Sequence, residues 1–361
     1  MAEGDRRRGW RMPPPTAAER VSWPASFGTR FTIIVDTEES FDWNEPLART
    51  GHDCAAAAAL PTAATRFAAL GAAPAYVVTH PIATDPAAVD ALCRVIADGR
   101  SSIGTQLHGW VTPPFDEPLT RRNSFAGNLP RALEAAKLDA LTGAISAAFG
   151  KRPTLFRSGR YGIGPHTTAL LAERGYLVES SARAHYEYVA EGGPNFRVVD
   201  NAAFVRDGLL ELPFSTVFTG RARRLGPALY HLADRVPRGR AMLTRAGLMS
   251  RISLTPEAMP LGDALEAVRV ALGDGNRLLN FAYHSPTLVP GNTPFVRDAA
   301  DLKLFWRWWD GVTGLLAQRN VAYATIDEIR CAACGAASAP VSGALRRGPV
   351  AQRLELAAHN G

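Results

Sequence analysis

The sequence lacks long apolar runs and is poor in cysteine, and each shortage excludes a class of protein. No stretch of about 18 consecutive apolar residues occurs, so we expect no membrane span. The first residues contain Arg6-Arg7-Arg8 and Pro13-Pro14-Pro15 but no apolar core of a secretory signal. We therefore expect residues 1–29 to form a disordered, basic, proline-rich arm. Four cysteines in 361 residues give no disulfide framework, which indicates a reducing, cytoplasmic location.

The excess of positive charge is small. The chain has 40 Lys and Arg against 34 Asp and Glu, and no stripe of basic residues alternates with aromatic ones. Nucleic acid is therefore not an expected partner. Cys331 and Cys334 have the spacing of a metal or redox pair, but no second pair or histidine stands near them. We expect no metal or redox role there and a flexible tail over residues 331–361.

The sequence does contain a series of short apolar segments that end in polar residues. Such segments are typical of strands buried on both faces. We expect strands at residues 31–35, 75–78, 102–107, 154–156, 176–178, 209–210, 278–283 and 321–326. Helical patterns lie between them, several with Pro near the start and Gly after the end. These patterns cover residues 61–70, 86–98, 129–149, 165–174, 261–272 and 298–319.

This alternation of strands and helices predicts a parallel sheet. In a closed barrel the carboxyl ends of all strands open onto one face, whereas an open sheet collects its functional residues at one switch point. Polar residues follow nearly every predicted strand, and no glycine-rich nucleotide motif follows any of them. We therefore predict a distorted α/β barrel of about seven to eight parallel strands over residues 30–330, with an insertion or helical cap at residues 217–258.

The candidate catalytic residues stand directly after these strands. Asp36 and Glu38 lie two residues apart, so their side chains point to the same side of an extended chain. Two such carboxylates repel each other unless a cation or a shared proton is present. His108 ends another strand beside Trp110, where a neutral imidazole is suited to metal binding. His284 follows the most apolar late strand and is the candidate general acid.

A second group of residues can bind substrate or position the catalytic groups. Arg157 lies on a glycine-containing turn after a strand, where a guanidinium can orient a carboxylate. The candidate substrate-binding residues, which are aromatic or charged, are Trp43, Trp110, Arg160, Tyr161 and Glu211. No Gly-x-Ser-x-Gly motif is present, so a serine acyl-enzyme is not expected.

Taken together, four segments resemble the polysaccharide deacetylases of the NodB-homology superfamily, and most closely the bacterial WalW-like group. These segments are residues 34–43, 103–117, 156–162 and 283–297, within a resemblance that covers roughly residues 31–329. The resemblance implies a distorted barrel and a divalent-metal-dependent hydrolysis of N- or O-acetyl groups on sugars, with zinc or a similar ion.

The resemblance also implies a role for each catalytic candidate. Asp36 matches the general base, Arg157 the arginine that orients it, and His284 the histidine that protonates the leaving amine or alcohol. Glu38 and His108 match metal ligands.

The second motif departs from that of the family. Typical members supply two metal-binding histidines four residues apart, and Gln106 and Trp110 occupy these positions here. A third metal ligand is therefore not identified.

We thus predict an enzyme that deacetylates a carbohydrate, acting on an acetylated glycan or glycan precursor. Two alternatives remain open: hydrolysis of a non-sugar amide on the same barrel, and a glycan-binding protein that has lost catalysis, which Gln106 favours. A glycosidase is a weaker alternative, because it needs the Glu38 and Glu211 carboxylates on either side of one bond.

Overall fold

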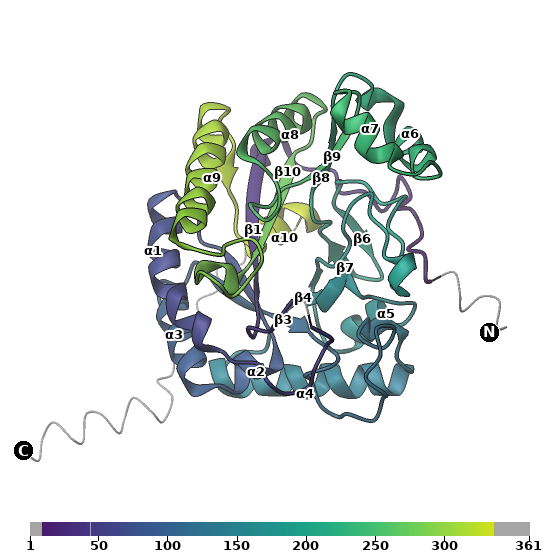
Figure 1. Ribbon diagram of the computed structural model, residues 1–361. Coiled ribbons are helices and arrows are strands. Elements are labelled where there is room, and N and C mark those ends of the chain that lie inside the picture. The colour runs from purple at the N-terminus through teal and green to yellow at the C-terminus, as the bar shows by residue number, and fades with distance from the viewer. Residues whose placement is uncertain (1–8, 44, 336–361) are drawn as a thin grey trace, which may run out of the picture.

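The computed structural model describes residues 9–43 and 45–335, and a curled, mostly parallel sheet surrounded by helices forms its centre (Figure 1). The sheet order is β10-β1-β2-β3-β4-β5-β7-β6, in which all pairs are parallel except β7 with β6. The strands are β1 Arg30–Thr37, β2 Ala75–Val78, β3 Ser102–Leu107, β4 Leu155–Ser158, β5 Val178–Glu179, β6 Phe204–Arg206, β7 Leu209–Glu211 and β10 Leu278–His284. The short strand β11, Ala322–Tyr323, pairs with the start of β1.

Hydrogen bonds link β10, at one end of the curled sheet, to the segment that follows β7 and to Leu254. The side-chain amide of Asn280 on β10 donates to the backbone oxygen of Leu212, just after β7, at 3.1 Å. The backbone N–H of Ser215 donates to the Asn280 oxygen at 3.2 Å, and that of Ala282 donates to the Leu254 oxygen at 3.3 Å. The seven parallel strands from β10 to β7 therefore close into a distorted barrel, which confirms the predicted fold class.

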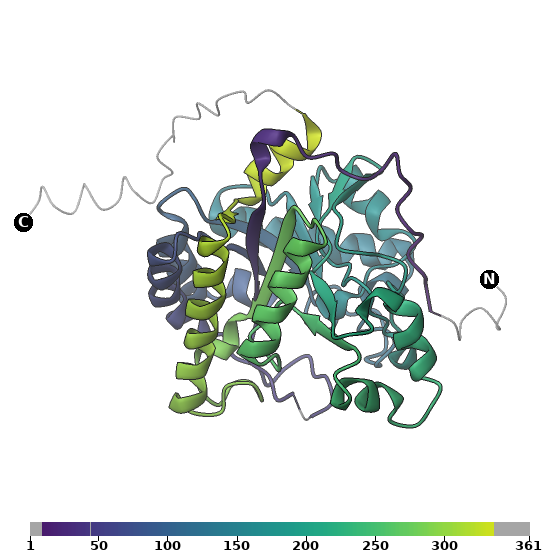
Figure 2. The same ribbon diagram turned by 90° about the horizontal axis from the view of Figure 1, so that it is seen from above.

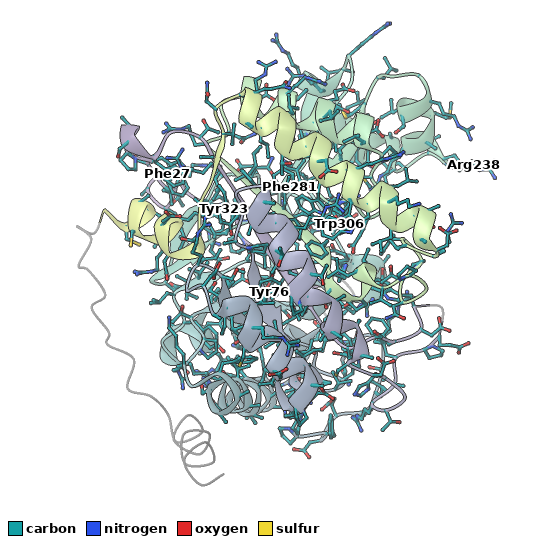
Figure 3. All side chains as sticks on the ribbon, turned by 90° about the vertical axis from the view of Figure 1, so that its left-hand side faces the viewer. Phe27, Tyr76, Arg238, Phe281, Trp306 and Tyr323 are labelled. Atoms are coloured by element: carbon teal, nitrogen blue, oxygen red, sulfur yellow. The ribbon has the colours of Figure 1, made fainter. Side chains whose placement is uncertain are left out.

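Helices cover the outside of this barrel, and the six predicted helices are all present (Figure 1, Figure 2). The helices are α1 Leu60–Ala69, α2 His80–Thr84, α3 Pro86–Ile96, α4 Arg131–Phe149, α5 Thr167–Glu173, α8 Leu261–Gly273, α9 Ala299–Gln318 and α10 Ile326–Cys334. Aromatic side chains fill the layer between the strands and α1 and α9, where the Trp309 ring lies 5.9 Å from Phe281 and 5.1 Å from Phe67. Phe281 and Trp306, which belong to this layer, are labelled in Figure 3. Among the described residues, no helix is both long and apolar enough to cross a membrane.

Alternate residues of the strands point into the barrel. Ile34, Val77 and Leu155 belong to one buried cluster, which also contains Ile326 and Ile329 of α10. Because α10 follows β11 at the start of β1, it closes the amino end of the barrel, beside the first turn of the chain (Figure 2). The carboxyl end of the barrel stays open. There, the last inward-facing residues of the strands are polar and form the site.

The segment before β1 packs against the domain, in contrast to the predicted disordered arm. Met12 is buried, and its backbone N–H donates to the Asn195 oxygen at 3.1 Å. Arg20 forms an ion pair with Asp200 at 2.7 Å. An apolar anchor and backbone partners on a distant loop thus fix a segment whose composition alone suggests disorder. Residues 1–8 of the predicted arm lie outside the described residues.

The two other predicted boundary regions are also partly described. Residues 217–258 contain an antiparallel hairpin, β8 Thr216–Thr219 with β9 Ser250–Ser253, joined through α6 Gly226–Ala233 and α7 Gly239–Arg245. The two short helices lie beside this hairpin (Figure 1). The predicted tail begins too early, because α10 continues to Cys334 and its alanines pack against the barrel cluster. Residues 336–361 lie outside the described part of the chain.

The loop after β3, which carries Trp110, is held by the buried side chain of Lys137 on α4. Its ammonium group contacts three backbone oxygens and one carboxylate, those of Gly109 (2.9 Å), Thr112 (2.7 Å), Pro114 (2.6 Å) and Glu117 (3.1 Å). A buried cation with this many partners fixes the course of the loop.

We expect Lys137→Met to lower the free energy of unfolding by about 3 kcal/mol, because Glu117 and the loop oxygens lose their donor in a buried place. Denaturant unfolding measures this change. Arg131→Met is a matched control on the same helix. Arg131 forms an ion pair with Glu173, and because both side chains are half-exposed, this pair should contribute less than about 1 kcal/mol to the free energy of unfolding. Equal losses in the two variants would contradict the proposed role of Lys137.

Candidate functional site

The carboxyl end of the barrel opens into a cavity of about 790 Å³. Nine of the ten predicted site residues line it: Asp36, Glu38, Trp43, His108, Trp110, Arg157, Arg160, Tyr161 and His284. Residues from four different strand ends, those of β1, β3, β4 and β10, thus meet in one space, as the barrel arrangement requires.

Asp36 of β1 and Arg157 of β4 form a buried ion pair in this cavity. The Nη1 atom of Arg157 donates to the Asp36 Oδ1 atom at 2.9 Å. The same guanidinium donates from Nε to the Ser180 backbone oxygen at 2.9 Å and from Nη2 to the Ser180 hydroxyl at 3.2 Å. Arg157 is therefore fixed on three sides, and it fixes the Asp36 carboxylate in turn.

His284 of β10 lies beside Asp36 because the two residues are register partners in the parallel β1–β10 pair. Its Nε2 atom is 3.7 Å from the Asp36 Oδ2 atom, and its Nδ1 atom is 2.7 Å from the Glu257 Oε2 atom. The other oxygen of Glu257 accepts from the His284 backbone N–H at 2.9 Å and from the Thr287 hydroxyl at 2.7 Å. One carboxylate therefore sets the orientation of the imidazole and its neighbouring backbone.

The charges around His284 favour its protonated form. Burial by itself lowers the pKa of this imidazole, but the carboxylates of Glu257, Glu38 and Asp36 outweigh burial and raise the pKa to about 10. A protonated imidazole whose Nε2 atom faces the cavity is suited to donate a proton to a leaving group.

Glu38 and His108 form a second cluster with two neighbours. The His108 Nε2 atom lies 3.2 Å from the Glu38 Oε2 atom, and its Nδ1 atom lies 2.9 Å from the Glu39 Oε1 atom. Gln106 donates from Nε2 to the same Glu38 oxygen at 3.1 Å. The other Glu38 oxygen is buried without a hydrogen-bond partner.

The predicted metal ligands do not make a complete metal site. Burial lowers the pKa of His108, but the charges of Glu39 and Glu38 outweigh burial and raise it to about 10. Across residues 9–43 and 45–335, no group of three or more His, Cys, Asp and Glu side chains is arranged to hold a metal ion. Catalytic zinc sites usually have three protein ligands, so the donor set here does not fit, and we assign no step to a metal.

We expect Gln106→His to raise the affinity for Zn²⁺ by about tenfold or more, which requires only about 1.4 kcal/mol. The new imidazole would stand where the Gln106 amide already reaches Glu38, and it would supply a third ligand. Competition with a chromophoric chelator measures the affinity, and Gln106→Asn is the control because it adds no metal-binding nitrogen. Equally tight binding by the wild type and both variants would show that a third ligand already exists.

The aromatic candidates differ in how freely they face the cavity. Trp43 is half-buried and lies edge-on to His284, with ring centroids 5.3 Å apart. Trp110 is only 3% exposed and stacks on the His108 ring at 4.2 Å, so most of its surface supports the imidazole instead of a ligand. Trp43 is therefore the better candidate for contact with a sugar ring.

Arg160 and Tyr161 follow Arg157 in a strained turn. Their φ angles are 56° and 59°, in the left-handed region, which costs non-glycine residues about 1–3 kcal/mol each. Such strain is found at binding and catalytic sites. Arg160 forms an ion pair with Glu191, and Tyr161 lies in the cavity wall.

Glu211 is the predicted site residue that the structure places elsewhere. It does not line the cavity, and it is fully buried beside its register partner Glu179. Leu210 points into the barrel, so the next residue of the strand points to the opposite face of the sheet. Burial and the charge of Glu179 raise the pKa of Glu211, which favours a shared proton. The predicted substrate contact is therefore not available, and the glycosidase alternative loses its second carboxylate.

The sequence analysis missed three residues that complete the site. Glu257 orients His284, Glu39 contacts His108, and Arg183 lines the cavity wall. Glu39 stood in the acidic segment already singled out, whereas Glu257 lies in the segment after β9, which was not among the predicted strands. Arg183 follows β5 in a segment with no regular pattern.

Comparisons with known proteins find solved structures with a similar backbone but no match at the level of sequence. No family model matches this chain, and no curated protein matches it. A protein from Mycobacterium smegmatis assigned as a polysaccharide deacetylase is 19% identical, with 91% of this chain and 99% of that chain covered and a TM-score of 0.49. A protein from Pseudomonas aeruginosa assigned to the same class is 11% identical, with 86% and 92% covered and a TM-score of 0.49.

The enzyme Puue allantoinase is also similar, at 14% identity, with 89% of this chain and 93% of that chain covered and a TM-score of 0.46. All three TM-scores are below 0.5, and the allantoinase differs in name from the two proteins assigned as polysaccharide deacetylases. These similarities therefore assign neither a family nor a reaction to this chain, and the side chains of the cavity have to carry the functional argument.

Proposed function

We propose that this protein is a hydrolase that removes N- or O-linked acetyl groups from a carbohydrate. One observation carries the proposal: the Asp36 carboxylate lies between the fixed Arg157 guanidinium at 2.9 Å and the His284 imidazole at 3.7 Å, in the wall of a large cavity. A base and an acid are thus held side by side, each with its own buried partner. The resemblance of the motifs around these same residues to carbohydrate deacetylases supports the choice of an acetyl group.

In the proposed reaction, Asp36 takes a proton from a water molecule as that water attacks the acetyl carbonyl carbon. His284 then donates its Nε2 proton to the departing nitrogen or oxygen as the bond to the acetyl group breaks. The products are acetate and a free amine or alcohol on the sugar. Arg157 keeps Asp36 in place, and Glu257 holds the charged imidazole with its Nε2 atom towards the cavity.

The wall of the cavity suits a sugar more than a small amide. Trp43 and Phe41 stack on each other with centroids 5.2 Å apart, and Phe295 lies against Trp43 at 5.6 Å. All three line the cavity near His284, where an aromatic surface can contact the apolar face of a sugar ring. A cavity of about 790 Å³ can hold more than one sugar unit.

The test is acetate release from a panel of acetylated compounds by the purified protein. N-acetylated and O-acetylated sugars and their short oligomers should release acetate, whereas N-acetylated amino acids should not. Release from the amino acids alone would favour the non-sugar amide hydrolase and overturn the proposal.

A glycan-binding protein without turnover is the second candidate, and the incomplete donor set at Glu38 and His108 favours it. In this case the sugars would bind without acetate release, and Asp36→Asn would not change the affinity by more than about threefold. Substrate binding and acetate release measured on the same protein sample separate the two candidates.

A further inference from the structure

One wall of the cavity carries a positive charge that no acidic side chain balances. Four arginines line the cavity, and three of them form ion pairs: Arg157 with Asp36, and both Arg121 and Arg160 with Glu191. The fourth is Arg183, which follows β5. Within the described part of the chain, no carboxylate lies within 4.0 Å of its guanidinium.

Neutral groups hold Arg183 in position. Its Nη2 and Nε atoms donate to the Ser253 hydroxyl at 2.7 Å and 3.2 Å, and its Nη1 atom lies 3.4 Å from the Tyr188 hydroxyl. The guanidinium carbon is 3.7 Å from the Tyr186 ring centroid and 5.3 Å from that of Phe214. The Arg183 guanidinium is therefore partly buried and fixed by aromatic rings and hydroxyl groups, and two of its five N–H groups have no hydrogen-bond acceptor among these partners.

A second unpaired cation lies next to this one. The Arg251 guanidinium carbon is 3.4 Å from the same Tyr186 ring centroid, and its hydrogen bond goes to the His185 backbone oxygen at 3.0 Å. Burial raises the pKa of Tyr186, but the charges of Arg183 and Arg251 outweigh burial and lower it overall. The two guanidinium groups thus make the electrostatic potential at this wall positive.

The charged wall is continuous with the catalytic part of the cavity. The Tyr161 ring stacks on Tyr188 at 5.5 Å and on Phe214 at 6.2 Å, and the Arg183 guanidinium lies 5.5 Å from its centroid. Tyr161 is the last residue of the turn Gly159–Tyr161, which directly follows β4 and its Arg157, so it joins the two regions. A ligand whose acetyl group lies at Asp36 can therefore extend along Tyr161 towards Arg183.

We propose that Arg183 binds an anionic group of the substrate, a carboxylate or a phosphate, so that the acetylated carbohydrate is an acidic one. This inference rests on the proposed function and names its substrate class. A guanidinium with a planar set of donors matches the two oxygens of a carboxylate or phosphate. An unbalanced charge in a half-buried place costs free energy, and a bound anion would recover it.

Three sugars that differ only at carbon 6 test the charge preference: glucose, glucuronic acid and glucose 6-phosphate. They carry no acetyl group, so the wild-type protein can bind them without turnover. We expect calorimetry to show that at least one of the two anions binds about 10- to 100-fold more tightly than glucose. The anion that binds more tightly indicates whether the site prefers a carboxylate or a phosphate. Equal affinity for all three, including no binding of any, overturns the proposal.

Two variants test whether Arg183 is responsible. Arg183→Gln should bring the affinity for the anions to within about threefold of that for glucose measured on the same variant. Arg197→Gln is the matched control, because Arg197 already forms an ion pair with Glu187 and does not line the cavity. Retention of the preference in Arg183→Gln, or its loss in Arg197→Gln, would contradict the assignment.

Acetate release from the N-acetylated counterparts of the same three sugars separates this inference from the proposed function. If the anions are preferred in binding but no acetate is released, the anion site stands and the deacetylase proposal fails. If acetate is released at equal kcat/KM from the neutral and the anionic sugars, the enzyme stands and the anion site fails.

Discussion

Asp36→Asn is expected to reduce the rate of acetate release by about 10²- to 10⁴-fold, the usual contribution of a positioned general base. The amide keeps the shape of the side chain and can still accept from Arg157, but it cannot take a proton from water. The buried Arg157 charge also loses its counter-charge, so the free energy of unfolding should fall by about 3 kcal/mol. Acetate release at a temperature well below the unfolding transition, together with denaturant unfolding, measures both changes.

Glu211→Gln is the matched control for this variant. Glu211 is as buried as Asp36 and also ends a strand, but it does not line the cavity, and burial together with the Glu179 charge raises its pKa. Replacing a neutral carboxyl by an amide there should leave turnover within about twofold of the wild type. A loss of turnover in Glu211→Gln as large as that in Asp36→Asn would mean that burial at any strand end, and not the base, is responsible.

Glu257→Gln is expected to move the alkaline limb of the pH–rate profile to lower pH by at least about one unit. The pKa of His284 is raised to about 10, so the wild-type imidazole stays protonated through neutral pH, and activity that needs its proton falls only as the pH approaches 10. The raised pKa also stabilises the fold fully below the ordinary value of about 6.5, and this stabilisation is lost as the pH rises towards 10. Removing the Glu257 charge reduces both effects.

His284→Gln is the companion variant, in which we expect turnover to fall by about 10²- to 10⁴-fold because no side chain remains to protonate the leaving group. The alkaline limb should disappear in this variant, since its titrating group is gone. An alkaline limb that stays at the wild-type pH in Glu257→Gln would contradict the role of this carboxylate. The same limb in His284→Gln would contradict the assignment of His284 as the acid.

The pattern of apolar segments was enough to predict the barrel and its main elements. All eight predicted strands and all six predicted helices are present. Apolar runs bounded by Pro and Gly indicate both which residues are buried and where a strand or helix begins and ends. The hairpin of β8 and β9 was predicted only as an insertion, since its short helices α6 and α7 lie on the outside with many exposed residues. The packing of the segment before β1 depends on contacts with residues far along the chain, which composition does not report.

Most of the predicted site residues line the cavity, but Glu211 does not, and the reason is that successive side chains of a strand point to opposite faces of the sheet. Asp36, Arg157 and His284 each lie an even number of residues after an inward-facing apolar residue, whereas Glu211 lies an odd number after one. Strands buried on both faces are apolar throughout, so the sequence does not show which alternate set points into the barrel. The polar residue at the end of β7 was therefore assigned to the wrong face.

Glu257 and Arg183 could not be predicted from strand ends alone. Each acts from an irregular segment, and its place beside His284 or Tyr161 is set by the folded hairpin and the turn after β5. Side-chain pairs between segments more than 20 residues apart require the three-dimensional structure.

The most direct test of the central claim is hydrolysis of an acetylated sugar by the purified protein in water enriched in oxygen-18. If Asp36 activates water for attack on the acetyl carbon, the label enters the acetate and the sugar product keeps oxygen-16 or its amine. Asp36→Asn should reduce the labelled acetate by about 10²- to 10⁴-fold. Label in the sugar product, or equal labelled acetate from the wild type and Asp36→Asn, would contradict the account.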